Sequence, residues 1–408
     1  MDPLWLGFTA ILSTILGYLI LQYLTVHPLQ MARTGFQTGG ILTLLGVNLF
    51  ISKENLLLNI AVAIVFALGS YLITTRRFLN QEDKRQIPEI TRSPEDPGLG
   101  HTAVVYFTHG EPETFNPIGW INQFKEFDEQ GIKFIPFQFR PFFIQALRRS
   151  YLRVGKSNHR GTHQEMLKNL ERAYRQQGDN KTRFYISFLD DDPRPDATAI
   201  QALNDGASRI IVSEVFLSIS NHTGEGEELI NELDIPEKYG VQVDYTGPLW
   251  DSDKLKSMFI ERASRNLGEF TKEETGVLLV GHGQPDEWDR EWPTETEHEI
   301  GFRQDILKLF ADDGYRLEHL SLAWMEFKSP KPAKKIEEFV SNGVRQILYF
   351  SAAISADAIH SQYDVPELIH EAKIPEEIVL KNLGAWNNDP IVILAIKEKI
   401  DRVFEKPF

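Results

Sequence analysis

The feature that most constrains this fold is a strand-like segment that ends on a histidine and occurs twice. Residues 104–113 read VVYFTHGEPE, and residues 277–286 read VLLVGHGQPD. In each, an apolar run leads directly into His-Gly, at His109 and at His282. A short apolar run of this kind predicts a strand buried in a parallel sheet. Because open α/β sheets bind ligands at the carboxyl ends of their strands, both imidazoles are predicted to lie at ligand-binding positions.

Three further landmarks follow each His-Gly in the same order, which indicates an internal duplication. A strand with a proline-containing turn behind it covers residues 184–195 in the first half and 320–332 in the second. The next strand ends on a histidine in both halves, His222 and His360. A GPLWD turn and a GAWNN turn then each lead into a helix.

In both halves, short Val/Ile/Leu/Tyr-rich strands alternate with helical stretches, such as 336–341 and 390–404. This alternation predicts βαβ units and a parallel sheet covered on both faces. We therefore expect an α/β fold of two doubly wound parallel-sheet domains that face each other across a cleft. The first domain is assigned to residues 101–250 and the second, which carries the predicted active site, to 251–408.

The first 78 residues differ in kind from the rest. Three stretches without formal charge, residues 3–24, 34–52 and 56–75, are each near the ~20 residues that a helix needs to cross a bilayer. We expect an all-α membrane anchor of three helices over residues 1–78. The second stretch is glycine-rich and contains Asn48, so two spans with a re-entrant or interfacial piece remain an alternative.

Charged residues around the anchor predict its orientation. Asp2, Lys53 and Glu54 fall at one end of the predicted helices. Basic residues flank the other end: Arg33, Arg76, Arg77, Lys84 and Arg85. The positive-inside rule then makes the chain a multi-pass membrane protein with its α/β domains on the cytoplasmic side. A polar, proline-bearing linker is expected over residues 79–100.

Composition limits the ligands that the chain can bind. The formal net charge of -15 argues against a nucleic-acid-binding surface, since a polyanion would be repelled. The chain has no cysteine, which excludes thiolate metal sites and iron–sulfur ligation by its own residues. Any metal must therefore be held by nitrogen and oxygen.

The first half is longer than the second by roughly 35 residues, which the repeat places between His109 and Phe184. Within this insert, residues 134–153 interleave aromatic side chains with arginines. That mixture suits a flat, apolar ligand with carboxylates on its rim. The alternative is an ordinary amphipathic helix with solvated arginines. The candidate substrate-binding residues are Arg140, Phe143, Arg148, Arg149 and Tyr151.

From about residue 102 to its end, the chain resembles the class II tetrapyrrole chelatases. The VGHGQPD segment at His282 looks like the Ser-Ala-His-Gly-Leu-Pro segment of ferrochelatases, and GEPET at Gly110 looks like their Gly-Gly-Pro-Glu-Thr. The insert after Arg148 is similar to the segment that forms one lip of their porphyrin cleft. MEFKSP at Met325 and HSQYDVPE at His360 resemble the sirohydrochlorin chelatases.

The resemblance implies a lyase that inserts a divalent metal into a tetrapyrrole. By position it assigns the catalytic and metal-binding roles to His282, Glu326 and His360. Imidazole with carboxylate suits divalent iron, cobalt, nickel or zinc, and removal of two pyrrole protons needs a base that titrates near neutrality. One departure is that Gln362 stands where ferrochelatases have a glutamate.

The function expected is ferrous iron insertion into a tetrapyrrole such as protoporphyrin at a membrane. No organic cofactor is expected, since Fe²⁺ or Co²⁺ would be a substrate. A second set, His109, Asp190 and His222, is either a second metal path or a relic of duplication. The alternatives are a sirohydrochlorin cobalt or iron chelatase, a non-catalytic tetrapyrrole or metal carrier, and a two-lobed receptor outside the membrane.

Overall fold

The computed structural model describes residues 3–81, 87–129, 131–132 and 135–405. The chain forms two compact units. The anchor unit comprises Met1–Arg85 and Thr114–Lys156, and the α/β unit comprises Gln86–Glu113 and Ser157–Phe408. Asp2, Lys84 and Arg85, which belong to the orientation prediction, lie outside the described residues, as does Phe134 in the insert.

The anchor unit contains the three predicted apolar helices, and each is long and apolar enough to cross a membrane. Its elements are α1 (Pro3–Thr25), η1 (Pro28–Gln30), α2 (Met31–Ile51), η2 (Lys53–Asn55), α3 (Leu56–Leu79), α4 (Pro117–Glu129), η3 (Phe137–Phe139) and α5 (Arg140–Val154). At Gly17 of α1 a Cβ atom would meet the Ala67 carbonyl oxygen at 2.1 Å. Glycine therefore lets α1 and α3 approach to backbone contact, as small residues do in membrane helix pairs.

Asn48, which interrupts the second apolar stretch, is 5% exposed and joins a polar network between the helices. Its Nδ2 donates to Thr9 Oγ1 at 2.7 Å, and the Thr9 hydroxyl donates to Asn59 Oδ1 at 3.2 Å. Asn59 Nδ2 in turn donates to Ser52 Oγ at 3.0 Å. Such hydrogen bonds stabilise helix association where no water is present, so Asn48 is compatible with an α2 helix.

The α/β unit contains two parallel four-stranded sheets with the same strand order. The first, β2-β1-β3-β4, is formed by β1 (His101–Thr108), β2 (Arg183–Phe188), β3 (Ala207–Glu214) and β4 (Gln242–Tyr245). The second, β6-β5-β7-β8, is formed by β5 (Thr275–Gly281), β6 (Leu320–Trp324), β7 (Gln346–Ser351) and β8 (Val379–Asn382). The predicted duplicated, doubly wound α/β architecture is confirmed.

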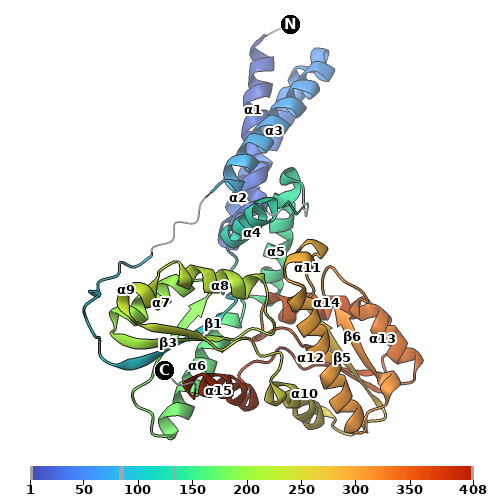
Figure 1. The fold of residues 1–408 in the computed structure, drawn as a ribbon. Helices are drawn as coiled ribbons and strands as arrows, with labels where there is room; N and C mark the ends of the chain where they lie inside the picture. Colours follow the sequence, from blue (N-terminus) through green and yellow to red (C-terminus); the bar gives the residue numbers. More distant parts are fainter. Residues whose placement is uncertain (1–2, 82–86, 130, 133–134, 406–408) are drawn as a thin grey trace. The chain divides into compact units, whose positions relative to one another are not determined.

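Helices cover both faces of each sheet. They are α6 (His159–Gln176), α7 (Pro195–Asn204), α8 (Asn221–Asn231), α9 (Ile235–Tyr239), α10 (Asp253–Asn266), α11 (Asp286–Glu291), α12 (Pro293–Asp312), α13 (Pro332–Ser341), α14 (Val365–His370) and α15 (Pro390–Phe404), with turns η4 (Leu317–His319) and η5 (His360–Asp364). Around the first sheet, α7, α8 and α9 lie on one side and α6 and α15 on the other (Figure 1).

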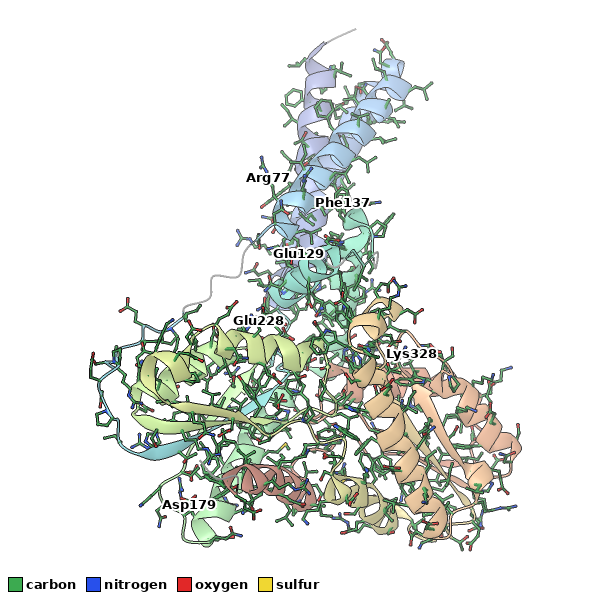
Figure 2. The ribbon with its side chains drawn as sticks, viewed as in Figure 1. Arg77, Glu129, Phe137, Asp179, Glu228 and Lys328 are labelled. Carbon is green, nitrogen blue, oxygen red and sulfur yellow. The ribbon has the colours of Figure 1, made fainter. Side chains whose placement is uncertain are left out.

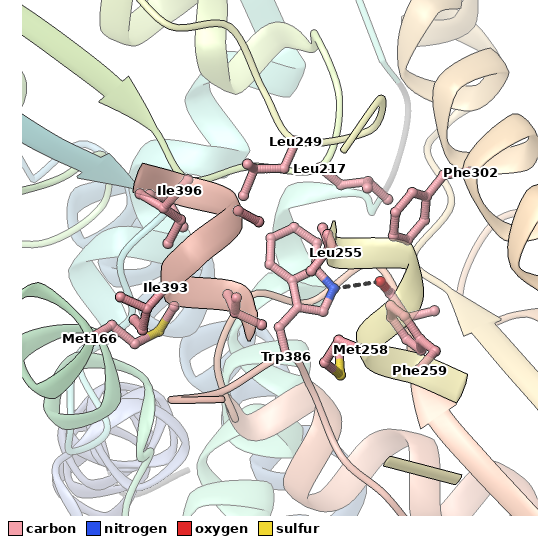
Figure 3. Packing of buried hydrophobic residues seen from close by; sticks show 14 of the residues in the cluster. Met166, Leu217, Leu249, Leu255, Met258, Phe259, Phe302, Trp386, Ile393 and Ile396 are labelled. Atoms are coloured by element: carbon pink, nitrogen blue, oxygen red, sulfur yellow. Dashed lines mark hydrogen bonds between the residues drawn. The ribbon is translucent and has the colours of Figure 1, made fainter. Parts of the chain in front are cut away.

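Successive strand residues face opposite sides of a sheet, and the core divides accordingly. Val104 of β1 belongs to a cluster that also contains residues of the second sheet, whereas its neighbour Val105 packs under α7. Trp386 is fully buried in the shared cluster, where its Nε1 donates to the Ala352 carbonyl at 2.8 Å (Figure 3). One hydrophobic core therefore joins the two sheets.

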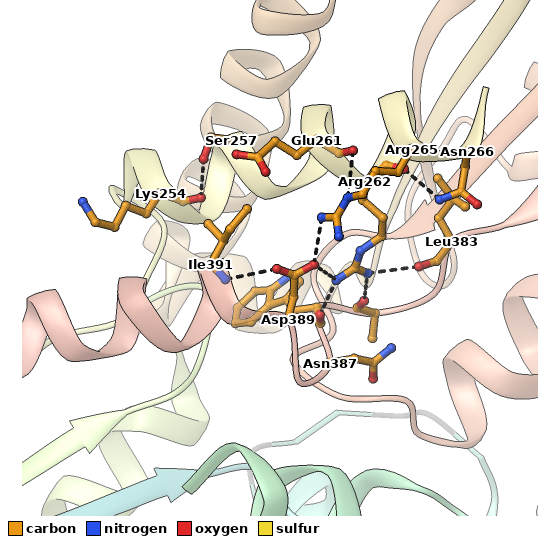
Figure 4. A network of polar contacts seen from close by, with 12 residues as sticks. Lys254, Ser257, Glu261, Arg262, Arg265, Asn266, Leu383, Asn387, Asp389 and Ile391 are labelled. Atoms are coloured by element: carbon orange, nitrogen blue, oxygen red, sulfur yellow. Dashed lines mark hydrogen bonds and ion pairs between the residues drawn. The ribbon is translucent and has the colours of Figure 1, made fainter. Parts of the chain in front are cut away.

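Helix α15, assigned above to the second domain, packs on β3 and α6 of the first. Arg262 of α10 holds the loop that leads into it, donating to the Leu383 carbonyl at 3.0 Å and pairing with Asp389 at 3.4 Å (Figure 4). Asp389 caps α15 by accepting from the Ile391 N–H at 3.0 Å. The boundary at residue 250 thus separates the strands of the two halves but not their helices.

The extra segment of the first half falls between β1 and β2, as the repeat predicts, and Thr114–Lys156 belongs to the anchor unit. Residues 87–100, the second part of the predicted linker, lie against the first sheet and its helices. There the Thr91 N–H donates to Asn204 Oδ1 at 2.8 Å, and the buried Arg92 donates to the Ala207 carbonyl at 2.5 Å.

Candidate metal site

His282 follows directly after β5, and its backbone and one ring nitrogen are fixed by hydrogen bonds. Its N–H donates to Glu299 Oε1 at 2.7 Å, and its Nδ1 donates to the Gly283 carbonyl at 2.7 Å. At Gly281 a Cβ would lie 2.1 Å from Glu299 Oε1, so only glycine fits there. With Nδ1 engaged, Nε2 is the nitrogen that can bind a metal.

His360 lies on the π-helical turn η5 and faces His282. The two ring centroids are 5.5 Å apart, and the ring planes are inclined at 79°. His360 Nδ1 is hydrogen-bonded to Asp364 Oδ2 at 2.7 Å. A carboxylate is a usual hydrogen-bond partner of a metal-binding histidine. By holding one ring nitrogen, it orients the other nitrogen toward the metal. The structure therefore brings together the two histidines predicted for the second half.

The two imidazoles have opposite electrostatic environments. Burial lowers the pKa of His282, and the nearby charge of His360 lowers it further against the opposing charge of Glu326. At His360 burial acts in the same direction, but the hydrogen bond to Asp364 and the charges of Glu326, Asp364 and Glu111 outweigh it and raise the pKa to about 9. At neutral pH the pair thus combines a neutral base with a protonated partner.

Glu326 is held beside His282 by the backbone. Its N–H donates to the His282 carbonyl at 3.0 Å, and at Gly283, whose φ is +82°, a Cβ would lie 2.6 Å from the Glu326 carbonyl oxygen. Among the described residues, no group of three or more His, Asp or Glu is arranged to hold a metal ion. Glu326 acts on both imidazoles through its charge, which raises the pKa of each, and the two side chains that the structure brings face to face are the histidines.

Glu111 is a carboxylate next to this pair that the sequence prediction did not include. It accepts from the Ile359 N–H at 3.0 Å and from the Ser157 hydroxyl. Burial raises its pKa, against the hydrogen bond from Ser157 and the charges of His360 and His109. The available signal was a departure from the family pattern, because Glu111 stands where the ferrochelatase Gly-Gly-Pro-Glu-Thr segment has a glycine.

The first-half set assembles in the same way. The ring centroids of His109 and His222 are 4.6 Å apart, with the planes at 80°. His109 Nδ1 donates to the Gly110 carbonyl at 2.9 Å and lies 3.4 Å from Asp190 Oδ2. Burial lowers the pKa of His222 well below its usual value, assisted by the charges of His109 and His282. Both predicted sets thus contain an imidazole pair.

The five candidate substrate-binding residues all lie in the anchor unit, and the two most buried arginines have partners there. Arg140 forms a two-point contact with the Asp128 carboxylate, at 2.7 and 2.5 Å. Arg148 is 1% exposed and donates to the carbonyls of Tyr23 and Val26, at 2.8 Å each. Because both carbonyls lie at the carboxyl end of α1, Arg148 joins α5 to α1.

The other three candidates differ in exposure. Phe143 packs against Trp120, with ring centroids 4.9 Å apart, and Tyr151 is buried against Phe115 at 6.2 Å. Arg149 is exposed. A role in substrate binding stays a prediction for all five residues, and Arg149 has the exposure that direct contact with an anionic ligand requires.

No protein-family model matches the sequence, and no curated protein matches it. SirB from Bacillus subtilis with Fe³⁺ matches with a TM-score of 0.46 and 14% identity, over 74% of this chain and 95% of SirB. The sirohydrochlorin chelatase SirB from B. subtilis subspecies spizizenii with cobalt matches at 0.45 and 11%, over 75% and 97%. DR2241 from Deinococcus radiodurans, described as structurally similar to chelatases, matches at 0.45 and 14%, over 74% and 54%. SirB and DR2241 are described as a chelatase and as structurally similar to chelatases, and with TM-scores below 0.5 these matches carry no argument about this chain.

Proposed function

We propose that this protein is a membrane-attached chelatase that inserts a divalent metal ion, ferrous iron in the first instance, into a tetrapyrrole such as protoporphyrin. The observation that carries the proposal is the facing pair of His282 and His360, each with Nδ1 fixed by an oxygen acceptor. Two imidazoles without thiolate bind divalent iron or cobalt without the tight hold that would prevent release.

The same residues supply the proton chemistry of insertion. The metal substrate binds Nε2 of a neutral imidazole, so the raised pKa of His360 means that the ion must displace a proton there. The macrocycle then loses two pyrrole protons as the metal enters. His282, whose pKa is lowered, is a neutral acceptor for one, and the carboxylates Glu326 and Glu111 beside the pair are acceptors for the other.

Membrane attachment favours an apolar macrocycle. The three helices of the anchor unit are long and apolar enough to span a bilayer, and we place the chain as multi-pass with the α/β unit in the cytoplasm, on the positive-inside rule. Protoporphyrin partitions into membranes more readily than the acidic sirohydrochlorin. Sirohydrochlorin is nevertheless the alternative macrocycle, with cobalt or iron as the metal.

A non-catalytic carrier is the second candidate function, because Gln362 replaces the ferrochelatase glutamate. In the structure the Gln362 side-chain oxygen accepts from the Asn158 N–H at 3.0 Å, so this residue joins η5 to the segment before α6. A carrier needs binding without turnover, whereas a chelatase needs both.

Purified full-length protein tests these possibilities in a matrix of Fe²⁺, Co²⁺ and Zn²⁺ against protoporphyrin and sirohydrochlorin. Continuous formation of one metallated product in excess substrate is the expected result. His282→Ala should lose insertion and keep macrocycle binding, while His370→Ala, an exposed histidine of α14, should behave as the wild type. A single stoichiometric uptake would identify a carrier, and turnover retained in His282→Ala would contradict the proposal.

A further inference from the structure

Three phenylalanines between residues 137 and 142 of the insert, in the anchor unit, have exposed side chains. Phe137 is 43% exposed, Phe139 55% and Phe142 49%. We call this set the phenylalanine face. Figure 2 shows Phe137 at the end of the helix bundle where Arg77 also lies. Large aromatic side chains exposed together mark an interaction surface, because water contact with so much apolar area is unfavourable.

Contacts with α3 give the depth of this face along the apolar helices. The Tyr71 hydroxyl donates to the Gln138 carbonyl at 2.7 Å, and the Tyr71 ring lies 6.4 Å from that of Phe142. Tyr71 is inside the apolar span Lys53–Leu79 and precedes the basic Arg76 by five residues. At 1.5 Å per residue, Tyr71 lies about 7.5 Å to the apolar side of Arg76 along α3, and Phe142 lies beside Tyr71.

The far end of α5 lies at the end of α1, where the span stops. Arg148, six residues after Phe142, donates to the carbonyls of Tyr23 and Val26. Beyond it, Arg149 and Arg153 are exposed. The exposed side chains of α5 therefore change from the aromatic Phe142 to mainly basic ones that begin at Arg149, about 10.5 Å further along the helix. This order matches a bilayer interface, with acyl chains first and anionic headgroups next.

We propose that the phenylalanine face is inserted into the bilayer beside α3, so that Thr114–Lys156 is an interfacial membrane element as well as part of the anchor unit. The occupant is lipid, because the face continues the exposed apolar surface of α3, where Leu72 and Ile73 are 36% and 57% exposed. The inference requires that helices α1, α2 and α3 lie in the membrane, and it is independent of chelatase activity.

The absence of cysteine makes a direct test possible in the full chain. Phe139→Cys, carrying a nitroxide spin label, is reconstituted into liposomes, and its collision rates with oxygen and with a water-soluble nickel chelate are compared. Val65→Cys, 65% exposed in α3, is the lipid control, and Leu317→Cys, 74% exposed in the α/β unit, is the aqueous control. The label at residue 139 should resemble that at residue 65, with high oxygen and low nickel accessibility.

Three outcomes would overturn the proposal. A label at residue 139 that resembles residue 317 would place the face in water. Protection from nickel only after protoporphyrin is added would make it a tetrapyrrole surface instead. An aqueous signature at residue 65 would refute membrane attachment itself, which separates that failure from a failure at the face alone. Phe137→Cys provides a second position and should give the same answer as Phe139→Cys.

Discussion

Glu299→Ala is the substitution whose effect on the site can be worked out most fully. Glu299 of α12 lies beneath the candidate metal site, where its Oε1 accepts from the His282 N–H at 2.7 Å and lies 3.7 Å from Arg303. The side chains of both partners are almost completely buried, 3% exposed for Glu299 and 0% for Arg303. Burial lowers the pKa of Arg303, and the Glu299 carboxylate opposes that shift.

Removing the carboxylate leaves a buried guanidinium without its counter-charge. Arg303 would keep its hydrogen bond to the Ala323 carbonyl at 2.7 Å and its position 4.0 Å above the Trp324 ring. Breaking one side of a buried ion pair costs about 3–5 kcal/mol in unfolding free energy. Glu299→Gln keeps an oxygen acceptor for the His282 N–H, so its unfolding free energy should fall less, by a total of about 1–3 kcal/mol. Replacing both partners, in Glu299→Leu with Arg303→Met, should recover most of the loss.

Urea denaturation of the full-length protein in detergent, with hydrogen exchange of β5 and β6 peptides, measures these effects locally as well as globally. Exchange should accelerate in Glu299→Ala first in the peptide containing His282, and metal insertion should fall with it. Stability equal to the wild type would refute the buried-pair argument. A double variant as unstable as Glu299→Ala would also refute it, since the cost would then not come from the unpaired arginine.

Three further predictions concern Glu214, Asp364 and Arg148. Burial raises the pKa of Glu214 from 4.5 to about 8. The folded state therefore keeps a proton that the unfolded chain releases, and stability should fall as pH rises between those two values. Thermal melts at pH 5 and pH 9 should show a smaller fall in Glu214→Gln. Asp364→Asn should lower the His360 pKa from about 9, which histidine NMR titration measures; an unchanged midpoint would refute the role given to Asp364. Arg148→Ala should accelerate amide exchange in the last turn of α1 and in α5, whereas unaltered exchange would show that Arg148 does not fasten them.

The strands and the duplication could be predicted because they depend on local sequence. The apolar runs that end at His109 and His282 form β1 and β5, and the terminal helix occupies Pro390–Phe404 as predicted. The prediction that the third strand of each half ends on a histidine was wrong, because β3 ends at Glu214 with His222 in α8, and β7 ends at Ser351 with His360 on η5. The pairing of His282 with His360 could still be predicted, because strand order places the segment that follows β7 beside the end of β5. The repeat also located the insert between β1 and β2.

What could not be predicted depends on contacts between distant segments. Nothing local to α15 indicates that it packs on the first sheet, and Arg148 has no sequence mark that distinguishes its helix-fastening role from ligand binding. Glu111 lies beside the second-half site through its hydrogen bond from the Ile359 N–H, 248 positions away in the sequence. Asp364 could have been found, because the spacing of four from His360 places both on one helical face.

The central claim is that His282 and His360 together bind a divalent metal. Co²⁺ titration of the full-length protein, followed by visible absorption, tests it most directly, with His370→Ala as the control and His109→Ala to separate the first-half set. The account predicts a saturable Co²⁺ spectrum that is lost in both His282→Ala and His360→Ala and retained in His370→Ala. An unaltered spectrum and affinity in His282→Ala would contradict it.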